Sequence, residues 1–375
     1  MKKPLIFDTT LREGEQTPTV VFKPEQKIEL ARKFSEFGVN YIDVMPAVSE
    51  NEKKTVKRLV KEELDAEIIA TCRLKKEDID SALDCDVKRV ALFTPVSDLH
   101  LQYLVKTNKE ENLKRAVESI EYAKSHGLEV DFALVDSSRA DEYYIRQFIE
   151  KISGKVETIF LGDSMGCWTP KKAHKVVKSV KNYCKSLVGL HEHNDFGLAT
   201  ANTLAGLEAG ADVFSGTFTG IGPRAGNASN EEVCMALEHL YKIPLGLKYE
   251  MLSEICNLVE KYSGFKVQNH KPIIGEYVYT HESGLHVAGL SREPKTFENF
   301  DPFTIGRSRR ILVGKQSGKT AVRYVLQKNG RSVSEEDAIK LLRRIKSLSE
   351  YKKRSFSEEE VVGIYEKEAS ALSNL

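Results

Sequence analysis

The stretch from residue 5 to residue 44 reads LIFDTTLREGEQTPTVVFKPEQKIELARKFSEFGVNYIDV and contains one complete strand–helix–strand unit. The short apolar runs Leu5–Phe7 and Tyr41–Val44 favour strands, because they are too short for helices. Between them, Lys23–Phe37 spaces its apolar side chains near helical intervals, and Gly38 is a residue type that commonly ends a helix. Strands that alternate with helices pair in parallel, so the stretch predicts a parallel sheet.

The same alternation repeats eight times before residue 245, which predicts an α/β protein built as a (β/α)8 TIM barrel. An open doubly wound sheet is the competing architecture, but no Gly-x-Gly-x-x-Gly turn follows the first strand. The expected strands are Leu5–Phe7, Tyr41–Val44, Glu67–Ala70, Arg89–Phe93, Leu128–Val135, Thr158–Leu161, Leu187–Leu190 and Asp212–Phe214.

The alternation of expected strands and helices stops after about residue 245. We therefore expect a catalytic barrel over residues 1–245 and a mostly helical C-terminal region over residues 246–375. The expected helices of this region are Leu252–Tyr262, Lys319–Lys328 and two that begin at the capping boxes Ser334–Asp337 and Ser357–Glu360.

Composition excludes several classes of protein. The 56 basic and 55 acidic residues nearly cancel, so no global field attracts nucleic acid or an anionic membrane. No run approaches the roughly 18 apolar residues of a membrane helix, and the apolar run near the start is too short for a signal peptide. The six cysteines are scattered without a Cys-x-x-Cys pair, so we expect reduced thiols in a cytoplasmic protein.

Two histidines, His191 and His193, stand one residue apart where the seventh strand ends. Side chains at positions i and i+2 of a strand point to the same side, so both imidazoles could reach one divalent ion. Taken alone, such a pair is more often two solvated loop histidines. Its meaning therefore depends on what surrounds it.

Polar residues follow other strands of the expected barrel as well, in Asp8–Gln16, Gly162–Gly166 and Thr217–Asn227. Active sites of TIM barrels lie at the carboxyl ends of the strands. Closure makes the seventh, eighth and first strands neighbours, so a carboxylate of the first loop and Asn227 can join the two imidazoles. Such a set, with positions left for substrate or water, is typical of a catalytic metal site.

Four ordered motifs resemble the 2-isopropylmalate synthase/homocitrate synthase family, and homocitrate synthases of the nitrogen-fixation type are the most similar branch. The resemblance runs from about residue 4 to about residue 325 and extends to barrel lyases such as hydroxymethylglutaryl-CoA lyase. The motifs are Asp8-Thr-Thr-Leu-Arg-Glu-Gly-Glu-Gln16, His191-Glu-His193-Asn-Asp195, Gly220-Ile-Gly-Pro-Arg-Ala-Gly-Asn227 and His281-Glu-Ser-Gly-Leu-His286.

The resemblance implies a Claisen condensation of acetyl-CoA with a 2-oxo acid at a divalent metal (Mg, Mn or Zn), with homocitrate from 2-oxoglutarate as the expected product. The alternatives are the same chemistry on another 2-oxo acid (oxaloacetate in a Re-type citrate synthase, or the isopropylmalate and citramalate reactions), a metal-dependent carbon–carbon lyase, and a non-catalytic metal-bound scaffold. The leucine-sensing domain of many isopropylmalate synthases is expected to be absent.

The resemblance also assigns roles to single residues. Arg12 polarises the keto oxygen, and His286 acts as acid/base in the active site of the other subunit, which implies a homodimer with exchanged C-terminal regions. The implied metal ligands are Glu13, His191, His193 and Asn227, with Asp8 as an alternative carboxylate, and the implied substrate contacts are Arg12, Gln16, Ser164 and Thr217.

Some positions depart from the family pattern. Val135 stands where a glutamate for proton transfer is usual, so Asp136 or Glu192 is expected to replace it, and Asp136 is the residue we assign. Phe297 replaces a tail tyrosine and cannot donate a hydrogen bond. The arginine that binds the distal carboxylate of 2-oxoglutarate in lysine-pathway homocitrate synthases falls at Asp131 or nearby. These departures leave the 2-oxo acid open.

Overall fold

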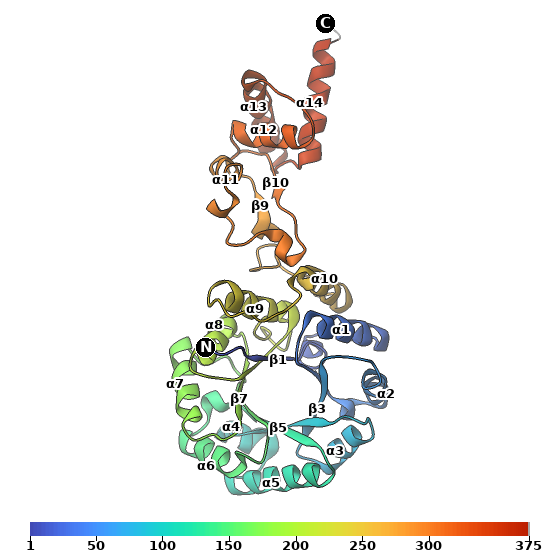
Figure 1. The fold of residues 1–375 in the computed structure, drawn as a ribbon, viewed down its shortest axis with the longest axis vertical. Coiled ribbons are helices and arrows are strands. Elements are labelled where there is room, and N and C mark those ends of the chain that lie inside the picture. The colour runs from blue at the N-terminus through green and yellow to red at the C-terminus, as the bar shows by residue number, and fades with distance from the viewer. Residues whose placement is uncertain (374–375) are drawn as a thin grey trace. The chain divides into compact units, whose positions relative to one another are not determined.

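Eight parallel strands close into a barrel in the first part of the chain, with helices around the outside (Figure 1). The structure is a computed structural model and describes residues 1–373. The strands are β1 (Leu5–Asp8), β2 (Tyr41–Val44), β3 (Glu67–Arg73), β4 (Arg89–Pro95), β5 (Glu129–Val135), β6 (Thr158–Asp163), β7 (Leu187–Glu192) and β8 (Val213–Gly216).

Each strand pairs with the next along the chain, and β8 returns to β1 with Phe7 opposite Ser215. The predicted (β/α)8 barrel is confirmed, and the expected strands differ from the observed ones only at their ends. Because β7, β8 and β1 are consecutive around the barrel, the loops that follow them open at one mouth.

The inside of the barrel is packed with side chains rather than open. Phe7, Ala91, Phe160 and other apolar residues from different strands form one buried cluster. A Cβ atom built on Gly189 of β7 would lie 2.4 Å from the Phe160 ring, so only glycine leaves room for that ring. This packing closes the barrel below the polar residues of the mouth.

Amphipathic helices cover the barrel. In α1, for example, the apolar face is buried and Gly38 ends the helix at φ 112°, a left-handed conformation that favours glycine. The helices of this unit are α1 (Pro24–Phe37), α2 (Glu50–Leu59), α3 (Lys76–Leu83), α4 (Asp98–His100), α5 (Lys109–Ser125), α6 (Glu142–Ile152), α7 (Pro170–Lys181), α8 (Ala199–Glu208), α9 (Asn230–His239) and α10 (Leu252–Ser263).

The first compact unit runs from Met1 to Val267, past the boundary expected at residue 245. The reason is helix α10, which packs on α1 of the barrel. Lys33 forms an ion pair with Glu254 at 2.8 Å, and the hydroxyl of Tyr262 donates to Glu29. Together with its buried apolar face, these contacts make α10 part of the barrel unit.

The second unit, Gln268–Leu375, is mostly helical, as the sequence predicts; its described residues also form one short parallel strand pair that was not expected. Both N-caps are present: Ser334 accepts from the backbone N–H of Asp337 at 3.1 Å, and Ser357 accepts from that of Glu360 at 3.3 Å. The reciprocal bond that completes a capping box runs from the backbone N–H of Ser357 to Glu360 at 3.0 Å. Its elements are β9 (Thr280–His281), α11 (Gly284–Leu290), β10 (Arg310–Ile311), α12 (Lys319–Lys328), α13 (Glu335–Lys352) and α14 (Glu358–Ser373).

The second unit has an apolar core of its own. Val322, Leu341 and Phe356 are among its buried members, which come from the helices and from the segments between them. Across the described part of the chain, no helix has both the length and the apolar character needed to cross a membrane.

Candidate active site

The two histidines of the seventh strand lie at the mouth of the barrel and face the same side. His191 is near the end of β7 and His193 follows it, with 5.0 Å between the centres of their rings. Nδ1 of His191 lies 3.0 Å from the hydroxyl of Ser215 on the neighbouring strand β8. This contact orients the ring and leaves Nε2 to face the mouth.

Glu13 completes a cluster with the two imidazoles. One ligand atom from each of Glu13, His191 and His193 lies within 4.8 Å of the others. Glu13 reaches this position because the loop after β1 turns back on itself, with the backbone N–H of Glu13 bonded to the carbonyl of Thr9 at 2.8 Å. The three residues, which the sequence places at the ends of two different strands, therefore lie together at the mouth of the barrel.

The protonation states of the cluster suit a divalent cation. Burial by itself raises the pKa of Glu13, but the charges of Arg12, His191 and His193 outweigh burial and hold this pKa at about 2. Burial lowers the pKa of His191 to about 3 and also lowers that of His193. At neutral pH the cluster thus offers a carboxylate and two neutral imidazoles, the forms that bind metal ions.

Asn227 lies beside this cluster, in the loop after β8. Its backbone forms a bridge with His193, and both polar atoms of its buried side-chain amide have no hydrogen-bond partner among the described residues. The same holds for Oε2 of Glu13 and Nδ1 of His193. Buried polar atoms are rarely left unpaired, so their convergence here fits a bound cation.

A glycine explains how Asn227 comes so close to β7. Gly226 has φ 86°, and a Cβ atom built on it would lie 2.0 Å from the carbonyl oxygen of Gly220. The backbone N–H of Asn194 bonds to the carbonyl of Gly226 at 2.9 Å, which ties the loops after β7 and β8 together. Any larger residue at 226 would clash with Gly220 and distort the loop after β8 that places Asn227.

Arg12 is held in a fixed position next to the metal cluster. Its guanidinium donates to Asp43 of β2 and to Glu13, the latter at 2.8 Å. Asp43 is fully buried and also accepts from the hydroxyls of Thr9 and Thr71. The carboxylate of Asp43 therefore acts as an anchor that points the arginine at the mouth.

A cavity of about 510 Å³ opens above these groups. Arg12, Gln16 and Ser164, all expected at the substrate, line it together with the metal cluster. The wall contributed by β4, β5 and β6 is apolar. It comprises Ala91, Phe93, Ala133, Val135 and Phe160.

Two residues expected in the active site, Thr217 as a substrate contact and Asp136 as a proton-transfer group, face elsewhere. The hydroxyl of Thr217 is fully buried and donates to the carbonyl of Ile221 at 2.7 Å, so it stabilises the turn after β8. Asp136 is fully buried, lies outside the cavity lining, and accepts from Ser97 and Arg139. These contacts leave neither side chain available to a ligand in the cavity.

Other carboxylates of the barrel also stay out of the cavity. Asp8 accepts hydrogen bonds from Thr10 and from Asn230, at 2.8 and 2.6 Å, so it braces the loop after β1. Asp131 is buried 3.7 Å from Arg89, and Glu192 is fully buried; neither lines the cavity. The cavity therefore has no acidic side chain besides Glu13.

His286 lies in the second unit, on α11. The side chain is exposed and stacks on Phe297, with 4.1 Å between ring centres. Its neighbour His281 is buried, with Nε2 3.3 Å from Glu298, which also pairs with Arg309. The two histidines thus differ: His281 is part of a packed ionic network, whereas His286 is accessible.

Sequence reasoning missed several residues that shape the site. Asp43 orients Arg12 and Ser215 orients His191. Each is a single polar residue within a strand, so no sequence motif marked it. Arg224 lines the cavity. Its guanidinium donates hydrogen bonds to the carboxylate of Asp195 at 2.7 Å and to the carbonyl of Ser164 at 2.6 Å. Its place in the Gly-x-Gly-x-Arg-Ala-Gly-Asn motif was the only available signal.

The sequence profile of the HMGL-like family matches residues 3–259, which cover the barrel and the first part of α10. The chain belongs to the HMGL-like family. A second profile, described as the homocitrate synthase post-HMGL domain-like family, matches residues 273–353 of the second unit.

Relatives with assigned names include homocitrate synthases. The homocitrate synthase AksA of Methanocaldococcus jannaschii is 44% identical, over 93% of this chain and 87% of its own. That of Methanothermobacter thermautotrophicus is 43% identical over 91% and 88%. The 2-isopropylmalate synthase of Methanocaldococcus jannaschii is 39% identical over 93% of this chain and 68% of its own.

Among solved structures, the barrel resembles hydroxymethylglutaryl-CoA lyases. The enzyme from Pseudomonas aeruginosa superposes with a TM-score of 0.64 at 22% identity, covering 71% of this chain and 95% of its own. At this identity the likeness concerns the fold, and it agrees with the predicted TIM barrel.

Proposed function

We propose that the protein is an acyltransferase that condenses acetyl-CoA with a 2-oxo acid, with 2-oxoglutarate as substrate and homocitrate as product. The observation that carries this proposal is the cluster of Glu13, His191 and His193 at the mouth of the barrel. Similarity to homocitrate synthases over most of both chains supports the choice of reaction.

Glu13, His191 and His193, with the amide of Asn227 beside them, would hold one divalent ion, which we propose to be Mg²⁺, Mn²⁺ or Zn²⁺. Such an ion supplies a Lewis acid that binds the keto and carboxylate oxygens of a 2-oxo acid. The carboxylate, imidazole and amide donors suit all three ions, so availability decides among them.

The guanidinium of Arg12 also faces the cavity, and its ion pair with Asp43 fixes its position. In the condensation, the methyl carbon of acetyl-CoA loses a proton and attacks the keto carbon, whose oxygen gains negative charge and is then protonated. A prearranged guanidinium stabilises that charge without having to reorganise. Water hydrolyses the thioester of the adduct, which releases CoA as a free thiol. We assign Gln16 and Ser164, which line the cavity, to the carboxylate end of the 2-oxo acid.

Proton transfer needs an acid or base in the cavity, and neither Val135, Asp136 nor Glu192 provides one there; outside the metal cluster, His100 is the imidazole of the barrel that lines the cavity. We propose that His286 of a second subunit fills this role, in a homodimer with exchanged C-terminal regions. Its exposure, and that of Leu285 at 75%, supports an encounter with another surface.

The apolar wall favours a second candidate, an isopropylmalate or citramalate synthase. Ala133 and Val135 offer nothing to the distal carboxylate of 2-oxoglutarate, whereas they suit a methyl or isopropyl group. Both candidates share the same reaction on acetyl-CoA and differ only in the 2-oxo acid.

Product analysis with competing 2-oxo acids distinguishes the two. We expect CoA release and homocitrate, a 2-hydroxy tricarboxylic acid, when acetyl-CoA is supplied with 2-oxoglutarate. Release only with pyruvate or 2-oxoisovalerate would favour the second candidate, and release only with oxaloacetate would indicate a citrate synthase. These four 2-oxo acids form the substrate panel. If none of them leads to CoA release, the acyltransferase proposal is contradicted, and a lyase or a non-catalytic scaffold remains.

A further inference from the structure

The loop after β1 carries three active-site residues on one short turn. Arg12 and Glu13 lie directly before a 3₁₀ helix, Gly14–Gln16, and Gln16 ends it. Side chains three positions apart lie on the same side of a 3₁₀ helix, and Glu13 and Gln16 both line the cavity. The orientation of this turn therefore decides where the carboxylate of the metal cluster lies.

The other sides of the turn pack against the rest of the barrel unit. A Cβ atom built on Gly14 would lie 2.9 Å from Cδ1 of Ile221 in the loop after β8, so the two loops fit closely there. Glu15 does not line the cavity and extends toward α1 instead. Its Oε2 accepts from the ammonium of Lys27 on α1 at 2.6 Å, and its Oε1 accepts from the backbone N–H of Phe22 at 2.8 Å. Glu15 thus ties the turn to the beginning of α1.

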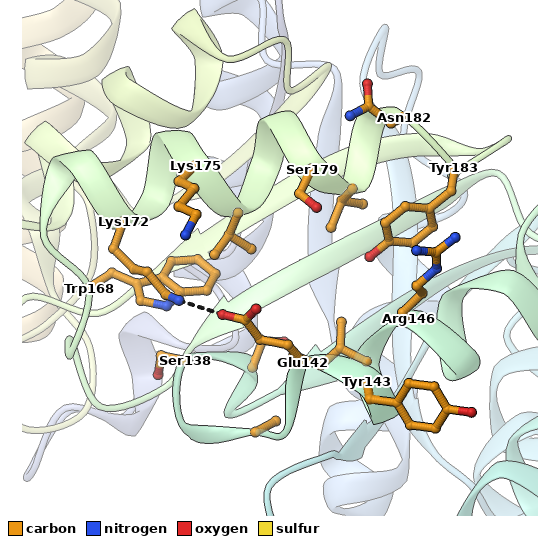
Figure 2. A pocket seen from close by; sticks show the side chains of 15 residues that line it. Ser138, Glu142, Tyr143, Arg146, Trp168, Lys172, Lys175, Ser179, Asn182 and Tyr183 are labelled. Carbon is orange, nitrogen blue, oxygen red and sulfur yellow. Dashed lines mark hydrogen bonds and ion pairs between the residues drawn. The ribbon is translucent and has the colours of Figure 1, made fainter.

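The ammonium of Lys27 is buried, which is unusual for a lysine. Only 1% of Lys27 is exposed, and its Nζ also lies 2.7 Å from both carboxylate oxygens of Glu52 on α2. An ordinary ion pair on the outside of the barrel is different. Lys172 of α7 and Glu142 of α6 meet at 2.7 Å, but their side chains are 41% and 78% exposed (Figure 2).

Burial makes the partners of Lys27 much harder to replace than those of an exposed lysine. Water can solvate the charges of an exposed pair when it opens, so such a pair contributes little. A buried ammonium that loses its carboxylates is left with an uncompensated charge. Conversely, without the ammonium the carboxylates of Glu15 and Glu52 would face each other at close range and repel. The network therefore holds Glu15, and with it the turn, in one position.

We propose that Lys27 is a positioning residue of the metal site, which acts through Glu15 on the turn that presents Glu13 and Gln16 to the cavity. This inference rests on the proposed function, in which Glu13 is a metal ligand. Lys27 is absent from the cavity lining, so its role is to hold the turn and not to react.

Two matched substitutions separate positioning from stability. Glu15→Gln and Glu52→Gln each remove one carboxylate from the same ammonium, but only Glu15 belongs to the turn. We expect both to lower the midpoint of urea unfolding. Calorimetric titration of metal-stripped, full-length protein with Mn²⁺ alone then measures the site. We expect Glu15→Gln to weaken Mn²⁺ binding by about tenfold or more and Glu52→Gln to change it by less than about twofold.

Lys27→Met removes the charge and should weaken Mn²⁺ binding at least as much as Glu15→Gln does. The control is Lys172→Met, which removes the exposed pair and should bind Mn²⁺ as the wild type does. Wild-type affinity in Glu15→Gln, or equal weakening by Glu15→Gln and Glu52→Gln, would overturn the positioning role while leaving the metal site in place. Failure of the wild type to bind Mn²⁺ would instead contradict the proposed metal site, and the inference with it.

Discussion

Asp131 gives the barrel a dependence on pH that is separate from catalysis. Burial raises the pKa of this carboxyl to about 6, although Arg89 and Thr158 counteract burial. Because the ordinary pKa of aspartate is about 4, the folded state holds a proton that the unfolded state releases between about pH 4 and pH 6. The stability that Asp131 contributes through its bound proton is therefore fully present below about pH 4. It is lost as the pH rises to about 6, because the folded state must then bury a charged carboxylate.

We predict that Asp131→Asn removes this dependence. Across the window, the free energy of unfolding of the wild type should fall by about 2 to 3 kcal/mol relative to that of the variant. Urea unfolding at several pH values, followed by far-UV circular dichroism, measures the difference. Parallel pH profiles of the two proteins would show that Asp131 ionises normally in the folded state.

Ala133 offers a direct test of which 2-oxo acid the cavity accepts. Ala133→Arg places a guanidinium in the apolar wall, where it can pair with a distal carboxylate. We predict that the ratio of kcat/KM for 2-oxoglutarate to that for 2-oxoisovalerate rises about tenfold or more. Ala133→Leu, which adds bulk without charge, is the control; an equal rise there would attribute the effect to shape alone.

At the scale of residues, the sequence predicts the metal ligands better than the residues that orient the site through hydrogen bonds. His191 and His193 follow from the two-residue period of a strand. Closure of the barrel predicts a carboxylate from the loop after the first strand, and the family resemblance identifies that carboxylate as Glu13. Asp43 and Ser215 do not follow, because their roles depend on which side chains of neighbouring strands meet across the barrel. Asp136 was expected to transfer protons in place of the usual glutamate, but its ion pair with Arg139 needs a turn that no local pattern indicates.

At the scale of elements, the caps of the C-terminal helices are open to measurement. Ser334→Ala removes the side chain that bonds to the first turn of α13, and we predict a loss of about 1 kcal/mol in the free energy of unfolding. Ser332→Ala, at an exposed position before the helix, is the control. Equal unfolding midpoints for the two variants in urea would show that the cap contributes nothing.

Strands and long helices follow from periodicity, but short irregular elements do not. All eight strands fall on the expected apolar runs, and α12 spans the expected residues Lys319–Lys328. By contrast, the short helix α4 and the single π-helical turn Leu101–Val105 escape prediction, because a few residues carry no period. The boundary after residue 245 was placed too early, since the packing of α10 on α1 is a tertiary contact.

At the scale of the whole molecule, exchange of C-terminal regions makes a prediction about mixed subunits. If His286 serves the partner's active site, His191→Ala and His286→Ala proteins should each be inactive alone. Heterodimers should have about half of wild-type activity, since one of their two sites contains neither substitution, and a co-expressed mixture in which about half of the dimers are heterodimers should recover about a quarter. A monomer in solution, or no recovery in the mixture, would contradict the exchange.

The central claim is that Glu13, His191 and His193 hold the metal at which acetyl-CoA and a 2-oxo acid react. The measurement that tests it most directly is thiol release from acetyl-CoA with the 2-oxo acid panel, by protein stripped of metal and then reloaded with Mg²⁺, Mn²⁺ or Zn²⁺. We predict release that depends on added metal in the wild type and in His174→Ala, a control on α7, and none in His191→Ala at any metal concentration. Full activity of His191→Ala, or of the stripped wild type, would contradict the account.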